Sequence, residues 1–196
     1  MGYKEEFIAL FNEHVHREGA AELLAWLEST DFFEAPASTR FHGACAQGLV
    51  LHSLNVYKVL RSKFCRDEEN MESVVIAALL HDVCKANYYT MSTRNVKNKD
   101  TGRWEEVPFY SIADELPYGH GEKSVWMIER YMRLTLEEAM AIRWHMGGFD
   151  DAARGGCKAI SEAYDAFPLA VKLHMADLAA TYLLEKGTSA VNKNKN

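Results

Sequence analysis

Residues 74–85 read Val-Val-Ile-Ala-Ala-Leu-Leu-His-Asp-Val-Cys-Lys, an apolar run followed by His81, Asp82 and Lys85. We expect a richly apolar helix from Glu72 to Lys85, with the run buried against the core. Burying the carboxylate of Asp82 costs free energy unless it is paired or binds a metal. Lys85 lies four residues after His81 and three after Asp82, so all three groups can converge on one spot.

Two further segments direct polar groups toward the same core. We expect one helix from about Gln47 to Phe64 and another from Pro168 to about Lys186. His52 on the first and Asp177 on the second each lie on an apolar stripe, and therefore point inward. The stripe of His52 contains Leu49, Val56 and Val59, and that of Asp177 contains Ala170, Leu173, Ala180 and Leu184.

Most of the remaining chain has helical periodicity as well. The additional predicted helices are Tyr3–His16, Ala20–Glu28 and a segment opened by a capping box at Thr135–Glu138 and closed by Gly147-Gly148. The exception is about 88–112, where aromatic and β-branched residues flank a Lys-Asp-Thr-Gly turn. That pattern predicts a β-hairpin inserted into an all-α fold.

The length of 196 residues and mass of 22.2 kDa suit a single domain spanning 1–196. Within it we expect N-terminal helices over 1–36, a helical core over 37–186 and a frayed tail over 192–196. Lys and Arg number 22 and Asp and Glu 28, a net charge of −6 that argues against long nucleic acid as a partner.

Other compositional features exclude further classes of protein. The longest apolar run is too short to span a membrane, and the first residues do not have the pattern of a secretory signal. The four cysteines are scattered without a CxxC pair, so we expect neither a disulfide framework nor a cysteine-rich zinc site. We therefore expect a reduced, cytoplasmic protein.

The inward histidines and aspartates each have an ordinary interpretation. A histidine on an apolar face is often a hydrogen-bonded core residue, and Asp177 can form a buried ion pair with Lys85. As a set, however, His52, His81, Asp82 and Asp177 come from three separate helices, and one divalent cation accounts for all four. This conjunction favours a metal site.

Two more histidines are candidates for the same site. His120 lies in the glycine-flanked stretch Tyr-Gly-His-Gly-Glu-Lys at 118–123, and His145 lies in the last turn of its helix. Loops and helix ends are well placed to reach into a cleft. Taken singly, each is either a ligand or an ordinary surface residue.

The ordered pattern His52, His81-Asp82, His120, His145 and Asp177 resembles the HD-domain metal-dependent phosphohydrolases over about 37–184. The stretch Ala-Ser-Thr-Arg-Phe-His-Gly-Ala at 37–44 and the stretch Leu-Leu-His-Asp-Val-Cys-Lys at 79–85 are similar to family segments. The departure is Val83-Cys84 where the family has Ile-Gly, at positions that carry no ligand.

The resemblance implies a compact all-α helical bundle in which His52, His81, Asp82 and Asp177 hold one metal. Members with two metals add histidines where His120 and His145 fall, with Asp82 bridging the ions. The candidate ligands are imidazoles and carboxylates without a thiolate, which suits Mn, Fe, Co, Ni, Zn or Mg. We favour a site capable of holding two metals.

The expected reaction is metal-dependent hydrolysis of a small phosphate ester, such as a nucleotide, by a metal-activated water. Asp82 would bridge the ions or orient the nucleophile, and Lys85 would neutralise phosphate charge. Candidates for substrate contact are Arg40, His42, Glu122, Lys123 and Arg143. The aromatic residues of the hairpin either form a lid that stacks on a base or pack the two strands against the core.

The same residues are compatible with two other functions. The same six ligands serve di-iron oxygenases related to this family, and a degenerate member would be a non-catalytic nucleotide-binding scaffold. The sequence leaves the substrate, the metal and the oligomeric state undetermined.

Overall fold

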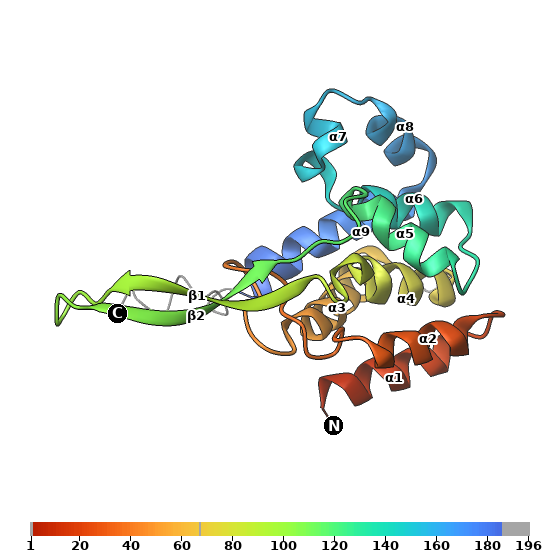
Figure 1. Ribbon diagram of the computed structural model, residues 1–196. Helices are drawn as coiled ribbons and strands as arrows, with labels where there is room; N and C mark the ends of the chain where they lie inside the picture. The colour runs from red at the N-terminus through yellow and green to blue at the C-terminus, as the bar shows by residue number, and fades with distance from the viewer. Residues whose placement is uncertain (1, 67, 186–196) are drawn as a thin grey trace.

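The computed structural model describes residues 2–66 and 68–185, and it confirms an all-α fold with an inserted β-hairpin (Figure 1). The predicted frayed tail at 192–196 lies outside the described residues. The α-helices are α1 (Tyr3–His14), α2 (Ala20–Ser29), α3 (Gly48–Val59), α4 (Met71–Leu80), α5 (His120–Glu129), α6 (Leu136–Trp144), α7 (Asp151–Arg154), α8 (Ala159–Ala166) and α9 (Pro168–Ala179). Single π-helical turns, η1 (Leu60–Phe64) and η4 (Ala180–Leu184), extend α3 and α9.

Helix α4 occupies the middle of the molecule. The Asn70 side chain caps its first turn by accepting hydrogen bonds from the backbone N–H groups of Glu72 and Ser73. Every residue from Ser73 to Leu80 is buried, because helices pack around α4 on several sides. The apolar run of the sequence therefore has no solvent-facing stripe.

The helix predicted to reach Lys85 is shorter than expected. It ends at Leu80, and the chain leaves the α-helical path at Asp82 before a short 3-10 turn, η2 (Val83–Lys85). This change of direction turns His81 and Asp82 toward the helices that follow, instead of continuing along the α4 axis.

The apolar interior forms two clusters that share α3 and α4. In the first, Phe7 of α1, Leu23 and Leu27 of α2, and Phe32 just after α2 form one cluster with buried residues of α3 and α4. In the second, α9 packs against α3, α4 and α6 through Val56, Ala78, Ala141 and Leu173. Because both clusters use α3 and α4, the positions of His52, within α3, and His81, just beyond α4, are held from two sides.

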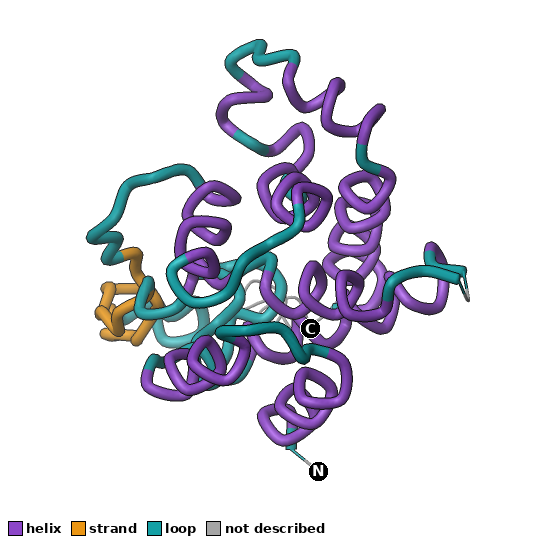
Figure 2. The backbone as a smooth tube through the Cα atoms, turned by 90° about the vertical axis from the view of Figure 1, so that its right-hand side faces the viewer, coloured by secondary structure: helices purple, strands orange, loops and turns teal. Residues whose placement is uncertain are grey.

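The hairpin consists of β1 (Tyr89–Lys97) and β2 (Trp104–Ile112), paired antiparallel from Tyr89–Ile112 to Lys97–Trp104. It extends away from the helices in Figure 1 and is seen end-on beside them in Figure 2. Trp104, near its tip, is 70% exposed. Among the described residues, each helix is too short or too polar to cross a bilayer.

Candidate metal centre

Two histidines from different helices point the same ring nitrogen at one another. His81, just after α4, donates from Nδ1 to the carbonyl oxygen of Ala78 at 2.8 Å. His52, on α3, has its Nδ1 at 3.1 Å from a carboxylate oxygen of Glu185. A carbonyl or carboxylate oxygen only accepts, so each Nδ1 carries a proton, and in the neutral form of each imidazole Nε2 carries the lone pair. The two Nε2 atoms are 3.3 Å apart.

Two carboxylates complete this group of atoms. Asp177 Oδ1, on α9, lies 3.2 Å from His52 Nε2, and Asp82 Oδ2 lies 3.5 Å from His81 Nε2. Neighbouring ligand atoms around a cation bound at about 2.0–2.2 Å lie roughly 2.9–3.6 Å apart. Lone pairs and negative charges converge here, so these four residues, which we name the first half-site, fit a divalent cation.

The electrostatics of the first half-site suit cation binding. Burial lowers the pKa of His81 to about 3, which keeps its imidazole neutral. Burial raises the pKa of Asp177, but the hydrogen bond and charge of His52 outweigh it, so the net shift is downward. Burial likewise opposes ionisation of Asp82, yet Lys85 and His81 hold its pKa well below the usual range.

His52 is the residue at which a proton competes with a metal. Burial lowers its pKa, but the hydrogen bonds and charges of Asp177 and Glu185 raise it to about 10. A ligating imidazole must be neutral, so cation binding at Nε2 displaces a proton there.

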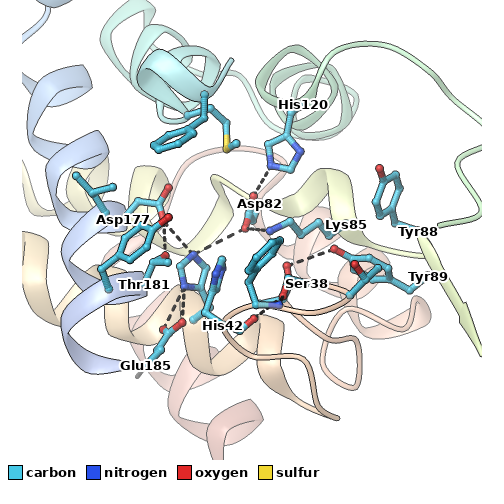
Figure 3. Close-up of a pocket in the computed structure, with 18 of the residues that line it drawn as sticks. Ser38, His42, Asp82, Lys85, Tyr88, Tyr89, His120, Asp177, Thr181 and Glu185 are labelled. Atoms are coloured by element: carbon cyan, nitrogen blue, oxygen red, sulfur yellow. Dashed lines mark hydrogen bonds and ion pairs between the residues drawn. The ribbon is translucent and has the colours of Figure 1, made fainter. Parts of the chain in front are cut away.

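The other oxygen of Asp82 faces the two remaining predicted histidines. His120, the first residue of α5, places Nε2 2.7 Å from Asp82 Oδ1, as Figure 3 shows. His145, which follows α6, places Nε2 3.5 Å from the same oxygen. Thus Asp82 lies between the first half-site on its Oδ2 side and a second half-site, formed with His120 and His145, on its Oδ1 side. All six predicted metal ligands therefore meet around Asp82.

Lys85 and a cavity lie beside these atoms. Lys85 Nζ bonds Asp82 Oδ2 at 2.6 Å, so its partner is not Asp177, the ion pair that the sequence left open. The cavity has a volume of about 660 Å³ and is lined by Lys85, Asp82, His52, His120 and Asp177. Its other walls are largely apolar and aromatic, formed in part by Phe41, Tyr88, Tyr89, Ile112, Phe149 and Tyr182.

Of the five predicted substrate contacts, His42 alone lines this cavity. Its ring centroid is 4.7 Å from that of His52, and both of its nitrogens are buried with no hydrogen-bond partner within the described chain. The structure places the other four outside the cavity lining. Arg40 is exposed, Glu122 and Arg143 form an ion pair with each other, and Lys123 binds Asp114.

The predicted hairpin lid divides into two parts. Tyr88 and Tyr89, at the base of the hairpin, line the cavity. Tyr110 packs edge-on against Tyr89, which agrees with the structural interpretation of these aromatic residues, and Trp104 lies far out near the tip.

Sequence reasoning missed three residues at the site. Glu185 contacts His52, and its place eight residues after Asp177 on one helical stripe was a usable signal. His174 donates from Nδ1 to the carbonyl oxygen of His145 at 2.7 Å. Cys84, assigned no ligand role in the sequence, lies with its sulfur against the ring of His120.

Comparison with known families agrees with this geometry. The HD domain family matches residues 49–180, a range that contains all six predicted metal ligands, and the chain belongs to this family. HD domains bind divalent metals and are mostly metal-dependent hydrolases. Searches of curated proteins and of solved structures gave no match.

Proposed function

We propose that this protein is a metal-dependent phosphohydrolase that acts on a nucleotide or a related small phosphate ester. The observation that carries the proposal is the convergence of His52, His81, Asp82 and Asp177 beside an open cavity. His52, Asp82 and Asp177 line this cavity together with Lys85. A cation site beside the ammonium group of Lys85 suits a substrate with a compact negative charge.

The dimensions and walls of the cavity support a small substrate. About 660 Å³ is within the usual range for small-molecule sites, and a polymer would need an extended groove. Tyr88 and Tyr89 offer aromatic surfaces on which a base can stack. The net charge of −6 leaves a long nucleic acid disfavoured, whereas one nucleotide needs only local positive charge.

The residues beside the candidate cation site each have a role in the proposed hydrolysis. A bound divalent cation supplies an acidified water and polarises a phosphoryl oxygen. Lys85 Nζ, already at the edge of the cavity, neutralises phosphate charge, and Asp82 holds the two half-sites in register through its two oxygens. His42 offers hydrogen-bonding nitrogens that the protein itself leaves unused.

The test is a hydrolysis screen of purified protein loaded in turn with Mn²⁺, Co²⁺, Ni²⁺, Zn²⁺ or Mg²⁺. Substrates would be p-nitrophenyl phosphate, its bis ester, and nucleoside mono- and cyclic phosphates. We expect turnover with at least one ester and its loss in Asp82→Asn. Asp100→Asn, at the exposed tip of the hairpin, is the matched control.

The same samples separate the two other candidate functions. Oxygen uptake by an iron-loaded sample without ester hydrolysis would identify an oxygenase. Tight nucleotide binding with no turnover under any metal would identify a scaffold. Either result, or hydrolysis that survives Asp82→Asn, would overturn the proposal.

A further inference from the structure

The second half-site contains a sulfur atom as well as imidazole and carboxylate groups. Cys84 Sγ lies 3.5 Å from Nδ1 and 3.6 Å from Nε2 of His120. Ligand atoms of Asp82, Cys84 and His120 all lie within 4.8 Å of one another. Because His120 also bonds Asp82 Oδ1, the thiol borders the same side of this carboxylate as the two histidines of the second half-site.

The backbone holds Cys84 in this place. The residue lies in the 3-10 turn η2 and is 2% exposed, and its N–H donates to Ser124 Oγ at 3.1 Å. Ser124 is on α5, the helix that begins at His120, so one hydrogen bond joins the two elements that bring the thiol and the imidazole together. The contact is therefore part of how η2 packs on α5.

A sulfur-to-ring distance of 3.5 Å also occurs in ordinary packing. His145 gives a separate indication of a cation. Its Nδ1–H donates to the Ile142 carbonyl oxygen at 2.6 Å, which leaves the lone pair on Nε2. That Nε2 belongs to a residue 0% exposed, has no hydrogen-bond partner among the described residues, and faces Asp82 Oδ1 at 3.5 Å. A buried lone pair directed at a carboxylate oxygen is unfavourable, so either a proton or a metal cation belongs between the two atoms.

We propose that the thiol of Cys84 joins Asp82, His120 and His145 as a ligand of a cation in the second half-site. A cation about 2.3 Å from sulfur and about 2.0 Å from nitrogen places these two ligand atoms roughly 3.5 Å apart in a tetrahedral shell. The distance from Cys84 Sγ to His120 Nε2, the nitrogen that faces Asp82, is 3.6 Å and is close to this value.

The thiol determines which cation this half-site selects. Thiolate ligands favour Zn²⁺, Co²⁺ and Fe²⁺, whereas Mg²⁺ and Mn²⁺ prefer oxygen. The second half-site is thus selective for a thiophilic cation, while the first, with imidazole and carboxylate groups, accepts a wider range. This inference rests on the proposed function because it names the metal class of the same site.

Cobalt spectroscopy of the metal-free full-length protein tests the assignment without any assay of activity. We expect titration with two equivalents of Co²⁺ to produce a near-ultraviolet sulfur-to-cobalt charge-transfer band. The band disappears in Cys84→Ser and in Cys84→Ala, and persists in Cys65→Ser, a control at a partly buried thiol away from the site. Absence of the band from the unmodified protein, or its survival in either Cys84 variant, overturns the proposal.

A competition measurement gives the selectivity. Replacing Cys84 by Ser should weaken Zn²⁺ binding at the second half-site by at least roughly tenfold, with much less effect on Mn²⁺. Equal losses for the two metals would contradict a sulfur ligand. The outcomes are separable from those of the proposed function. Ester hydrolysis without the cobalt band defeats the thiol ligand alone, and the band without hydrolysis defeats the phosphohydrolase alone.

Discussion

At the scale of single residues, the site depends on which ring nitrogen of each histidine carries the proton. His81 and His145 each donate from Nδ1 to the carbonyl oxygen three residues earlier in the chain, at Ala78 and Ile142. The backbone therefore selects the tautomer that leaves Nε2 free for a cation. His52 has no such carbonyl partner, and its Nδ1 faces a carboxylate from the far end of the chain instead.

Glu185 should consequently influence metal affinity without being a ligand of the first half-site. Its oxygen Oε1 accepts from His52 Nδ1 and from Asn55 Nδ2, the latter at 2.9 Å. We expect Glu185→Gln to weaken cation binding by roughly 10- to 100-fold, because the neutral amide orients and polarises His52 less well. Competition against a chromophoric chelator measures this change.

The matched control is Glu22→Gln, on the exposed face of α2. Both variants remove one negative charge, so a nonspecific effect of net charge would weaken binding in both. Unchanged metal affinity in Glu185→Gln would show that the contact with His52 is only structural.

At the scale of elements, helices and hairpin have separate tasks. The helices α3, α4 and α9 carry the candidate ligands of the first half-site, at His52, at His81-Asp82 just beyond α4, and at Asp177. The hairpin contributes to the cavity only at its base, through residues such as Tyr89 and Ile112. Beyond its base most of its side chains are exposed, so this part buries little apolar surface.

Shortening the hairpin should therefore leave the fold and the metal site intact. The variant removes residues 93–108 and joins Ser92 to Phe109, which pair across the strands, through an Asn-Gly turn. We expect the melting temperature to change by less than about 4 °C, since exposed side chains contribute little to stability. Calorimetry and metal analysis check this, and a loss of bound metal would show that the strands support the helical body.

At the scale of the whole molecule, a bound cation would join three helices that are distant in the chain. The first half-site links α3, the end of α4 and α9, and cation binding favours the folded state in which these are assembled. Burial of Asp82 and Asp177 at one place brings together negative charges that a cation offsets.

Metal addition should accordingly raise thermal stability. At a free cation concentration 100 times the dissociation constant, the folded state gains about 2.7 kcal/mol. For a chain of this size that corresponds to a rise in melting temperature of roughly 5–10 °C. Differential scanning fluorimetry with and without chelator measures the shift, and Asp177→Asn should show a much smaller one. A full shift in that variant would contradict the first half-site.

A second link across the molecule involves a buried carboxylate. Glu138 on α6 accepts two hydrogen bonds from Arg17, at 2.7 and 2.9 Å, and one from Ser73 Oγ on α4 at 2.6 Å. Burial raises the pKa of Glu138, but the hydrogen bonds from Arg17 and Ser73 outweigh it, so its pKa is lowered on folding. A carboxyl group whose pKa is lower in the folded state stabilises the protein at pH values above its unfolded-state pKa. This stabilisation is lost as the pH falls through the folded-state pKa.

Replacing Glu138 by Gln should therefore destabilise the protein in a pH-dependent way. We expect the free energy of unfolding to fall by about 2–4 kcal/mol at pH 7, because Arg17 loses its buried partner. The difference from the unmodified protein should narrow below about pH 4, where the carboxyl group begins to protonate. Urea unfolding at pH 7 and below about pH 4 measures the difference in free energy of unfolding, with exposed Glu162→Gln as control. A difference independent of pH would show that charge is not the cause.

Several features of the molecule could be predicted from the sequence because they depend on neighbours along the chain. Helical periodicity placed His52 and Asp177 on inward faces, and the capping box at Thr135 is present as predicted, with Glu138 as its partner. Alternating aromatic and β-branched residues around a turn predicted the hairpin. The six histidines and aspartates of the family pattern do converge around Asp82.

Tertiary structure alone decided which atoms meet. Periodicity specifies the face on which a residue lies, but distances between helices depend on how their side chains pack. Packing therefore determined that Glu122 and Arg143 neutralise each other away from the cavity. It also brought Cys84 against His120, a contact across 36 residues of chain that no local pattern specifies.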